Sequence, residues 1–244
     1  MADQAAPPRA TLSISLFGPD HGTWVRYASH LLAGMTAFAK HPGSEHWDVR
    51  LYHDDHITPA FRVKMQALTN GRTQFVPMGR SHGLDGMFWR FLVHDDDSVD
   101  VYFVHDAEEG FTPDALAEMD AWRQAGSNRP PFVTIKPRWY HTARNRSTRV
   151  KVPGGYFGVD RRQAPRFRVQ PLIEQKTLSS TRSIPRERTG YGADELWLED
   201  VFLPAMGGVV SYTLKWNPVL NRGNGARRAH PDFEDMVCAP IASI

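Results

Sequence analysis

The chain has 244 residues, of which 41% are hydrophobic and 23% charged, values that suit a globular domain with a buried core. Its 7 Trp and 13 Phe exclude a disordered chain, and its single cysteine, Cys238, excludes an internal disulfide and a cysteine-based zinc site. The net charge is only +2, no apolar run approaches the roughly 20 residues of a membrane span, and no signal-peptide pattern opens the chain, so we expect a cytoplasmic protein without a membrane span.

Two kinds of apolar pattern alternate along the first half of the chain. Alternating or continuous apolar runs predict strands, and apolar residues at helical spacing predict helices. The predicted strands are 11–17, 47–53, 73–76, 99–104 and 131–136. The predicted helices are 24–40, 59–69, 83–94 and 113–124. The last of these has a good start signal, since Thr112 can cap it and Pro113 suits its first position.

This order of elements predicts the fold class, an α/β domain with a mostly parallel sheet flanked by helices. In such sheets a ligand binds beyond the carboxyl ends of the strands. We therefore expect Phe17, Gly18 and residues 53–55 and 106–109 to lie on one rim of the sheet.

The second half of the chain is less regular, and only a helix within 191–206 is predicted there. The other segments are interpreted as non-helical: loop at 137–153, a tight glycine-rich turn at 154–158 and an exposed basic insertion at 160–190. The expected boundaries are a flexible leader at 1–10, a single domain at 11–216 and a C-terminal tail at 217–244.

An acidic segment, His105-Asp106-Ala107-Glu108-Glu109, directly follows the strongest predicted strand. Two carboxylates at a strand end can hold a hard divalent cation, which in turn can bridge the phosphates of a nucleotide and stabilise a departing diphosphate. The alternative is that these acids merely solvate the end of the strand. For an isolated Asp-x-Glu that alternative is the commoner one.

Further motifs stand around this segment in a definite order. Phe88-Trp89-Arg90-Phe91 precedes it, a predicted helix with Trp122 follows it, and then come Gly154-Gly155-Tyr156-Phe157-Gly158 and Tyr191-Gly192-Ala193-Asp194-Glu195. This order resembles a family of small bacterial and viral glycosyltransferases of the GT-A fold, whose patterns are F-W-R-F, R-D-x-D-S, G-G-M-W-G and Y-G-x-D-Q. The resemblance extends over roughly residues 12–206, since 15–18 and 47–52 are similar to the family's donor-binding region.

The resemblance implies an enzyme that moves a sugar from a nucleotide-sugar donor, with a UDP-sugar as the expected donor and Mn²⁺ or Mg²⁺ as the expected metal. Asp106 and Glu108 would hold the metal and the diphosphate. Phe17 and Gly18 would lie against the base and ribose. Arg90 would point to the phosphates or the sugar, a role that suits its fork of donors.

Three further roles follow from the same resemblance. Gly154 and Gly155 would let backbone approach the sugar where a Cβ would block it. Asp194 would lie near the reacting carbon, as a base or as a carboxylate that stabilises the cationic sugar of the transition state.

Each of these residues also has a structural alternative. Arg90 can be a surface arginine on an apolar helix, and Trp89 and Phe91 are better explained as core than as a ligand platform. The two glycines at 154–155 can form an ordinary turn. Asp194 can cap a helix, because it precedes an apolar run.

The chain departs from the family pattern at several positions. Glu108 stands where the family has its second Asp, Glu195 where it has Gln, and Lys136 where it has an acid. No histidine occurs in 211–215, where the family often has a late metal ligand, and His230 is the only later candidate. A donor site is therefore better supported than a metal, and Lys215 or an arginine can neutralise the diphosphate instead.

The basic insertion suggests an acceptor. Its four leading arginines, which could contact DNA or another polyanion, are Arg161, Arg162, Arg166 and Arg168. A solvated loop is the commoner explanation of such a run. A third hypothesis is a transferase-like binding protein without catalytic activity, which the substitutions around the acidic segment would favour.

Overall fold

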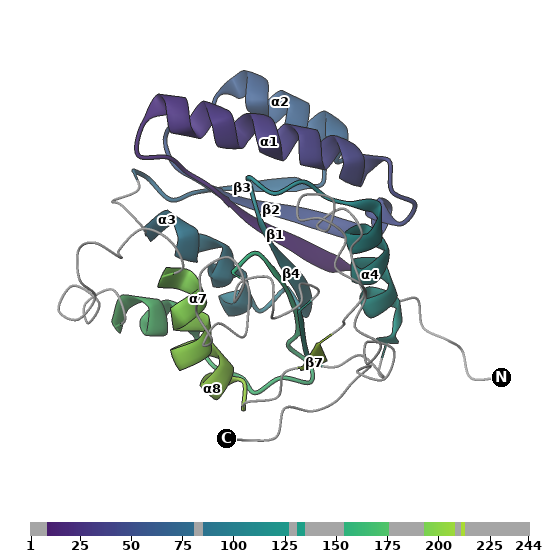
Figure 1. Cartoon of the computed structure of the whole chain (residues 1–244), viewed down its shortest axis with the longest axis vertical. Helices are drawn as coiled ribbons and strands as arrows, with labels where there is room; N and C mark the ends of the chain where they lie inside the picture. Colours follow the sequence, from purple (N-terminus) through teal and green to yellow (C-terminus); the bar gives the residue numbers. More distant parts are fainter. Residues whose placement is uncertain are drawn as a thin grey trace, which may run out of the picture.

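The computed structural model describes residues 9–80, 85–126, 131–134, 154–175, 193–207 and 211–212. Figure 1 shows one layered body, in which a twisted sheet has α1 and α2 above it and α3, α7 and α8 below it. The two hydrophobic clusters of the protein lie on the two faces of this sheet, so strands at its centre are buried on both sides.

The sheet has seven strands in the order β3-β2-β1-β4-β6-β5-β7. Their bounds are β1 Ala10–Leu16, β2 Trp47–His53, β3 Thr73–Pro77, β4 Val101–Asp106, β5 Phe132–Thr134, β6 Tyr156–Asp160 and β7 Ser211–Tyr212. Strands β1 to β4 are parallel to one another, whereas β6 runs antiparallel to both of its neighbours, β4 and β5. The prediction of a mostly parallel α/β sheet is confirmed, with one reversed strand inside it.

The upper face is covered by α1 His21–Ala39 and α2 Pro59–Leu68, and α4 Pro113–Gln124 packs on the same cluster. Each helix begins at a side-chain cap. Thr112 accepts a hydrogen bond from the Ala115 N–H at 3.2 Å, which confirms the predicted start of α4. Helix α1 begins three residues before its predicted start, because Asp20 caps it through the Thr23 N–H at 2.8 Å.

The lower face is made of shorter pieces. The predicted helix at 83–94 is instead α3 Asp85–Phe88 followed by a 3-10 helix, η2 Trp89–Asp95. The predicted C-terminal helix consists of α7 Ala193–Trp197, a π-helix η5 Leu198–Phe202 and α8 Leu203–Ala205. Trp89 and Phe91 are buried here, and Phe91 stacks on Trp197 at 5.4 Å between ring centroids. The core interpretation of these two residues is confirmed.

The register of the strands brings the residues of the predicted ligand rim together at one end of the sheet. Leu16 of β1 pairs with His53 of β2, and Ser15 pairs with Asp106 of β4. Because β6 is antiparallel, its first residue, Tyr156, pairs with His105 near the end of β4. The beginning of β6 therefore lies at the same rim as the carboxyl ends of the parallel strands.

The glycine-rich segment 154–158 is only partly the turn that we predicted. Residues 154–155 form a turn, but the rest of the segment belongs to strand β6. Gly158 suits a strand at this place because a Cβ there would lie 2.9 Å from the ring of Trp122 on α4. A glycine is therefore needed at position 158 because helix α4 packs closely on the sheet there.

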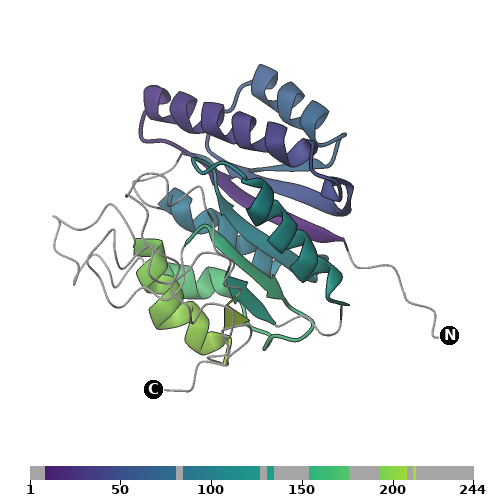
Figure 2. The same cartoon turned by 45° about the vertical axis from the view of Figure 1, so that its right-hand side comes forward.

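The described part of the predicted basic insertion is packed onto the domain. Residues 169–175 form a helix (the green ribbon beside α7 in Figure 2). Asp95 caps this helix, accepting the N–H groups of Val169 at 2.6 Å and Gln170 at 2.8 Å. Phe167 lies 4.4 Å from the His94 ring, between ring centroids. The prediction that this segment is exposed holds for most of the side chains at 162–175, but the expectation of a loop is wrong for 169–175, a helix that Asp95 at the end of η2 binds.

Candidate active site

Arg90 is the centre of the candidate site. Its side chain donates through Nη1 to the carboxylate of Asp106 and through Nη2 to that of Asp194, the latter at 2.5 Å. Arg90 is 5% exposed and Asp194 is 4% exposed. The alternative of a surface arginine is therefore wrong. One guanidinium joins the end of β4 to the first turn of α7.

Asp194 does not occupy the helix-capping position. Helix α7 begins at Ala193, so Asp194 lies inside the first turn. Its carboxylate accepts hydrogen bonds from the Glu195 N–H and from Arg90. The side chain is thus aimed at the arginine and away from solvent, as a site residue would be.

The two glycines at the start of β6 close the site from the other side. A Cβ on Gly154 would overlap the Asp194 carboxylate and lie 3.0 Å from the Arg90 guanidinium. A Cβ on Gly155 would overlap the Asp106 carboxylate. An ordinary turn does not require this, so both glycines are needed for close approach to the acids.

The Arg90 guanidinium is surrounded by several carboxylates, among them those of Asp106, Asp194 and Glu108. Burial and, next, the charge of Asp106 raise the pKa of Glu108 to about 7, although Glu108 as a whole is exposed and water weakens the effect. Burial and, next, the charge of Asp194 raise the pKa of Glu195 to about 7. Burial raises the pKa of Asp194 as well, against the pull of Arg90.

Burial opposes the charge of Arg90, but the surrounding carboxylates outweigh it and raise the pKa of the guanidinium. Arg90 is therefore a permanent cation, while the neighbouring acids compete for it. A cationic or electron-poor group that entered here would find carboxylates already desolvated.

Phe17 and Gly18 lie next to this centre, at the end of β1. The Phe17 ring meets Trp89 edge-on at 5.8 Å between centroids, and a Cβ on Gly86 would overlap it. The Gly18 N–H donates to Asp54 at 2.9 Å, and a Cβ on Gly18 would lie 2.8 Å from the Trp24 nitrogen. Phe17 and Gly18 thus both lie at the predicted ligand rim of the sheet.

Sequence reasoning placed Asp54 on the rim without giving it a role. This aspartate is 1% exposed and accepts from Gly18 and from the backbone N–H of His56 at 3.0 Å. It fixes the loop after β1 to the loop after β2. The available signal was its position directly after a buried strand.

A divalent cation is compatible with the chemistry of the site but is not specified by it. Asp106 and Glu108 provide the carboxylate oxygens that Mn²⁺ and Mg²⁺ accept. Burial first, and repulsion by Asp106 next, raise the pKa of Glu108, and a bound cation would relieve that repulsion. Among the described residues no group of three or more His, Cys, Asp or Glu is placed to hold a metal ion. Lys136, Lys215 and His230 lie outside the described residues.

The four arginines proposed for a polyanionic acceptor are mostly engaged in internal pairs. Arg161 donates to the Val99 carbonyl at 2.8 Å and to Asp97 at 3.2 Å. Arg168 also binds Asp97, at 2.9 Å, and Arg162 binds Asp160 at 2.9 Å.

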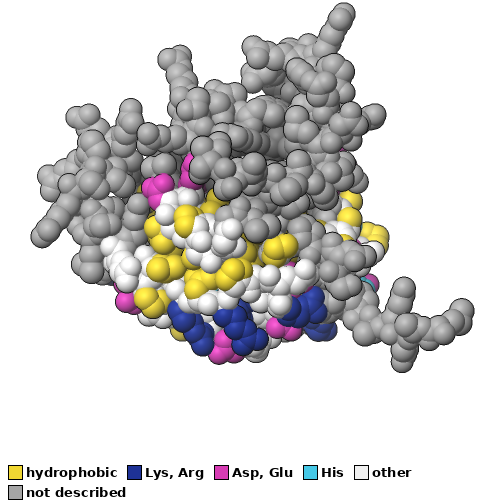
Figure 3. Space-filling view, turned by 90° about the horizontal axis from the view of Figure 1, so that it is seen from below, with side chains coloured by type: hydrophobic (Ala, Val, Ile, Leu, Met, Phe, Trp, Pro, Cys, Tyr) yellow, Lys and Arg dark blue, Asp and Glu magenta, His cyan; other side chains and the backbone are white. Residues whose placement is uncertain are grey.

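Arg166 is exposed and makes no ion pair within the part of the chain that the structure describes. Figure 3 shows basic side chains next to acidic ones on the face seen from below, and no patch of one sign among the coloured atoms. The charges that suggested a polyanion site thus serve largely to join segments of this chain.

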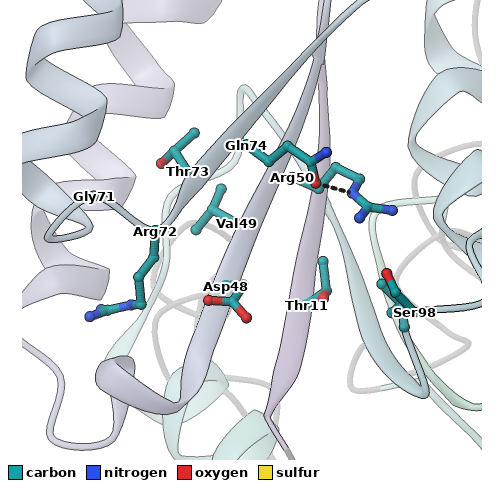
Figure 4. Close-up of a pocket in the computed structure, with 10 residues that line it drawn as sticks. Thr11, Asp48, Val49, Arg50, Gly71, Arg72, Thr73, Gln74 and Ser98 are labelled. Atoms are coloured by element: carbon teal, nitrogen blue, oxygen red, sulfur yellow. Dashed lines mark hydrogen bonds between the residues drawn. The ribbon is translucent and has the colours of Figure 1, made fainter.

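A cavity of about 440 Å³ opens at the other end of the sheet, where β1, β2 and β3 begin. Figure 4 shows Arg50 and Gln74 pointing toward one another there, with a hydrogen bond of 3.0 Å. Arg50 also pairs with Asp96 at 2.5 Å, and Arg72 is bound to the carbonyls of Trp47 and Ser44. The arginines that line this cavity are therefore engaged within the protein, and the candidate site lies at the opposite rim of the sheet.

In the described residues, no helix has the length and apolar character to cross a membrane.

The amino-acid sequence matches no protein-family model and no curated protein. Solved structures resemble the chain by fold. The galactosyltransferase LgtC, in complex with donor and acceptor sugar analogs, is 12% identical, with a TM-score of 0.50 over 96% of this chain and 84% of its own. An active-site mutant of LgtC has 13% identity and a TM-score of 0.51 over the same shares.

Other similar structures are longer than this chain. The glycosyltransferase GlyE of Streptococcus pneumoniae is 11% identical, with a TM-score of 0.49 over 85% of this chain but only 45% of its own. The chain spans 34% of the S. aureus TarS structure with UDP-GlcNAc, and about half the length of several other structures that it matches. Identities this low show the fold alone. The predicted GT-A-like fold, a mostly parallel sheet flanked by helices, is confirmed.

Proposed function

We propose that this chain is a glycosyltransferase that takes its sugar from a nucleotide-sugar donor, with a UDP-sugar as the first donor to test. The observation that carries the proposal is the Asp106–Arg90–Asp194 bridge, closed by Gly154 and Gly155 at the carboxyl rim of a GT-A-like sheet. A buried ion-pair network often adds no net stability, and a ligand is expected to bind at this rim, so the position of the network is consistent with a functional role.

The chemistry of glycosyl transfer fits these residues. Its transition state resembles an oxocarbenium ion, which a desolvated carboxylate stabilises. Asp194 is such a carboxylate, since it is buried and held in one orientation by Arg90. In this proposal Asp194 is the catalytic residue, and Arg90 holds it in place while contributing positive charge toward the donor phosphates.

Donor binding in this proposal uses the neighbouring rim. Phe17 and Gly18 would lie against the nucleoside, because the end of β1 stands beside the end of β4. Gly154 and Gly155 would leave room for the sugar beside the two aspartates, since neither has a Cβ. Asp106 and Glu108 would hold Mn²⁺ or Mg²⁺, and the cation would supply charge neutralisation for the diphosphate.

The acceptor has no assigned site in this proposal. DNA or another polyanion would need free cationic side chains, and three of the four arginines considered for it are bound to acids or carbonyls of this chain. Salt-dependent binding of DNA is therefore expected to be weak.

The direct experiment is calorimetric titration of the full chain with UDP and with GDP, each with and without Mn²⁺, followed by an assay of donor hydrolysis. We expect one diphosphate to bind, and in the presence of Mn²⁺ we expect Asp106→Ala to weaken its binding by about tenfold or more, since the bridging cation would lose a carboxylate ligand. Glu174→Gln is the control, because Glu174 is an exposed carboxylate with no proposed role in the site. If neither nucleotide binds, the proposed donor site is wrong. If a nucleotide binds but no donor is turned over, the chain is a transferase-like binding protein.

A further inference from the structure

Arg90 is held by its backbone as well as by its side chain. Ser13 donates its hydroxyl to the Arg90 carbonyl at 2.6 Å, and the Arg90 N–H donates to the Ser15 hydroxyl at 2.8 Å. Both serines belong to β1 and stand two residues apart, so they point to the same face of the sheet. The backbone carbonyl and N–H of Arg90 are thus both hydrogen-bonded by serine side chains of strand β1.

Serine is an unexpected residue at these positions. Strand β1 lies between β2 and β4, and Ser13 and Ser15 are 0% and 3% exposed. Strands buried on both faces are usually continuous in Val, Ile and Leu, because a buried hydroxyl costs stability unless it is bonded. Both hydroxyls form hydrogen bonds with the Arg90 backbone, and these bonds offset the free-energy cost of burying them.

The strand register connects these serines to the acids of the site. Ser15 pairs directly with Asp106 in the parallel ladder of β1 and β4. The same serine binds the backbone of Arg90, and the Arg90 side chain binds Asp106. These contacts form a closed ring of three residues, which fixes the Arg90 backbone relative to the carboxylate that its side chain must reach.

The side chain of Arg90 depends on this anchoring. Its Nε–H is buried and has no acceptor within the described part of the chain, so among the described residues only the two carboxylates accept hydrogen bonds from the guanidinium, which also lies over the Phe91 ring. Arg90 is the second residue of η2, and Phe88 before that helix provides no side-chain cap. A short 3-10 helix has weak hydrogen bonds of its own. The bonds to β1 therefore place the residue more firmly than the helix does.

We propose that Ser13 and Ser15 are positioning residues, which set the place of Arg90 so that its guanidinium spans Asp106 and Asp194. They touch neither donor nor acceptor and act through Arg90. The consequence for function rests on the proposed glycosyl transfer, but the placement of Arg90 does not.

The placement can be measured without activity. In a ¹⁵N spectrum of the full chain, the Arg90 side-chain N–H signals, identified by their loss in Arg90→Lys, should be sharp and slow to exchange, because the group is buried in two ion pairs. In Ser13→Ala/Ser15→Ala these signals should broaden or exchange at least about tenfold faster. Thr69→Ala is the matched control: it removes a buried hydroxyl bonded to the Met65 carbonyl, far from Arg90. It should leave the Arg90 signals unchanged.

The catalytic readout is separate. If a nucleotide-sugar is turned over, the double serine variant should lose at least about tenfold in kcat with a smaller change in KM, while Thr69→Ala stays within about twofold. Ser15→Cys keeps the side-chain volume with a weaker hydrogen bond and should fall between wild type and the double variant. If the double variant does not fold, Ser15→Cys provides the same test on its own. Unchanged Arg90 exchange in Ser15→Cys and the alanine variants would overturn the proposal. If the exchange of the Arg90 signals changes but no donor is turned over, the positioning role of the serines stands and only the proposed glycosyl transfer is contradicted.

Discussion

Gly154 lies so close to the Asp194 carboxylate that no side chain fits between them. Gly154 lies just before strand β6 and Asp194 lies in the first turn of helix α7, so this contact is where the reversed strand meets the C-terminal helices at the rim. Asp194 is held on its other side by Arg90. The carboxylate is therefore fixed between a backbone and a guanidinium, and any atom added at Gly154 must move it.

We expect Gly154→Ala to disable the site more than it destabilises the fold. The added methyl group should push Asp194 out of its bond with Arg90, with a loss of about 1–3 kcal/mol in the free energy of unfolding from overpacking. Turnover should fall by about a hundredfold, because misplacement of a catalytic group by one ångström has effects of that order. Urea denaturation and a donor-hydrolysis assay measure the two quantities.

Gly110→Ala provides the control for this variant. Gly110 also lies near the rim, but a Cβ there has no heavy atom within 4 Å and its backbone conformation is ordinary. It should be close to wild type in both measurements. Equal losses in the two alanine variants would mean that general loop rigidity, and not contact with Asp194, explains the effect.

The Arg90–Asp194 pair should show strong thermodynamic coupling. Arg90→Ala leaves a buried carboxylate without its cation, and such a change costs about 3–5 kcal/mol. The double variant Arg90→Ala/Asp194→Ala should lose much less than the sum of the single variants, since neither charge is then buried alone. A double-mutant cycle by urea denaturation gives the coupling. Additive losses would show that the two side chains do not interact in solution.

Arg90→Lys separates charge from geometry at the same position. Lysine keeps the positive charge but cannot bind two carboxylates through a planar fork. We expect most of the folding stability to remain, while kcat/KM falls by about tenfold or more. Wild-type kcat/KM in Arg90→Lys would mean that only the charge of Arg90 matters.

Local patterns predicted much of the fold because they depend on neighbours in the chain. Strand β2 and helix α2 appear at or within one residue of their predicted bounds, and the Thr112 cap is where its sequence signal placed it. Asp106 and Glu108 were predicted from their position at the end of a strand, whereas Arg90 and Asp194 were predicted from the resemblance to the glycosyltransferase family. What joins them was not predictable from local pattern, because Arg90 and Asp194 are 104 residues apart.

Two features of the chain depend on contacts between segments that are far apart in the sequence, and local patterns do not show such contacts. The polar–apolar alternation of β1 normally marks a strand with one wet face, yet Ser13 and Ser15 are buried and bind a residue more than seventy positions away. The basic run after residue 160 looked like a surface for a polyanion. Its partners, 95–97, stand far earlier in the sequence, so only the folded chain brings the charges together.

Stability should decrease with rising pH because of Glu195. Burial and, next, the charge of Asp194 raise the pKa of this group from 4.5 to about 7 in the folded state. Between those values the folded chain keeps a proton that the unfolded chain has released. The contribution is therefore complete below pH 4.5 and is lost as pH rises through 7. Burial raises the pKa of Asp194 too, which acts in the same direction.

Glu195→Gln should remove this dependence. We expect the variant to be more stable than wild type at pH 8, by up to about 3 kcal/mol if the whole shift is realised, and little changed at pH 4.5. Urea denaturation at the two pH values tests it. Glu174→Gln is the control, since Glu174 is an exposed carboxylate on the helix at 169–175. A gain for Glu195→Gln that is equal at both pH values would show that Glu195 does not hold a proton at neutral pH.

The acids at the end of η2 should contribute very unequally to stability. Asp95 accepts two backbone N–H groups of the helix at 169–175, whereas Asp97, whose side chain is exposed, pairs with the half-buried Arg161 and the exposed Arg168. Loss of a capping carboxylate typically costs about 1–2 kcal/mol, but an exposed ion pair contributes only about 0–1 kcal/mol because solvent screens it. We therefore expect Asp95→Ala to lower the free energy of unfolding clearly, and Asp97→Ala to change it little.

The two variants also differ in their expected response to salt. At about 0.5 M NaCl any loss in Asp97→Ala should vanish, since the Debye length then falls to a few ångströms. The loss in Asp95→Ala should persist, because hydrogen bonds to backbone N–H groups hold the helix in place whatever the ionic strength. Denaturation curves of both variants at low and high salt measure this. If Asp97→Ala is the more damaging variant, the basic residues, and not the Asp95 cap, attach this segment to the domain.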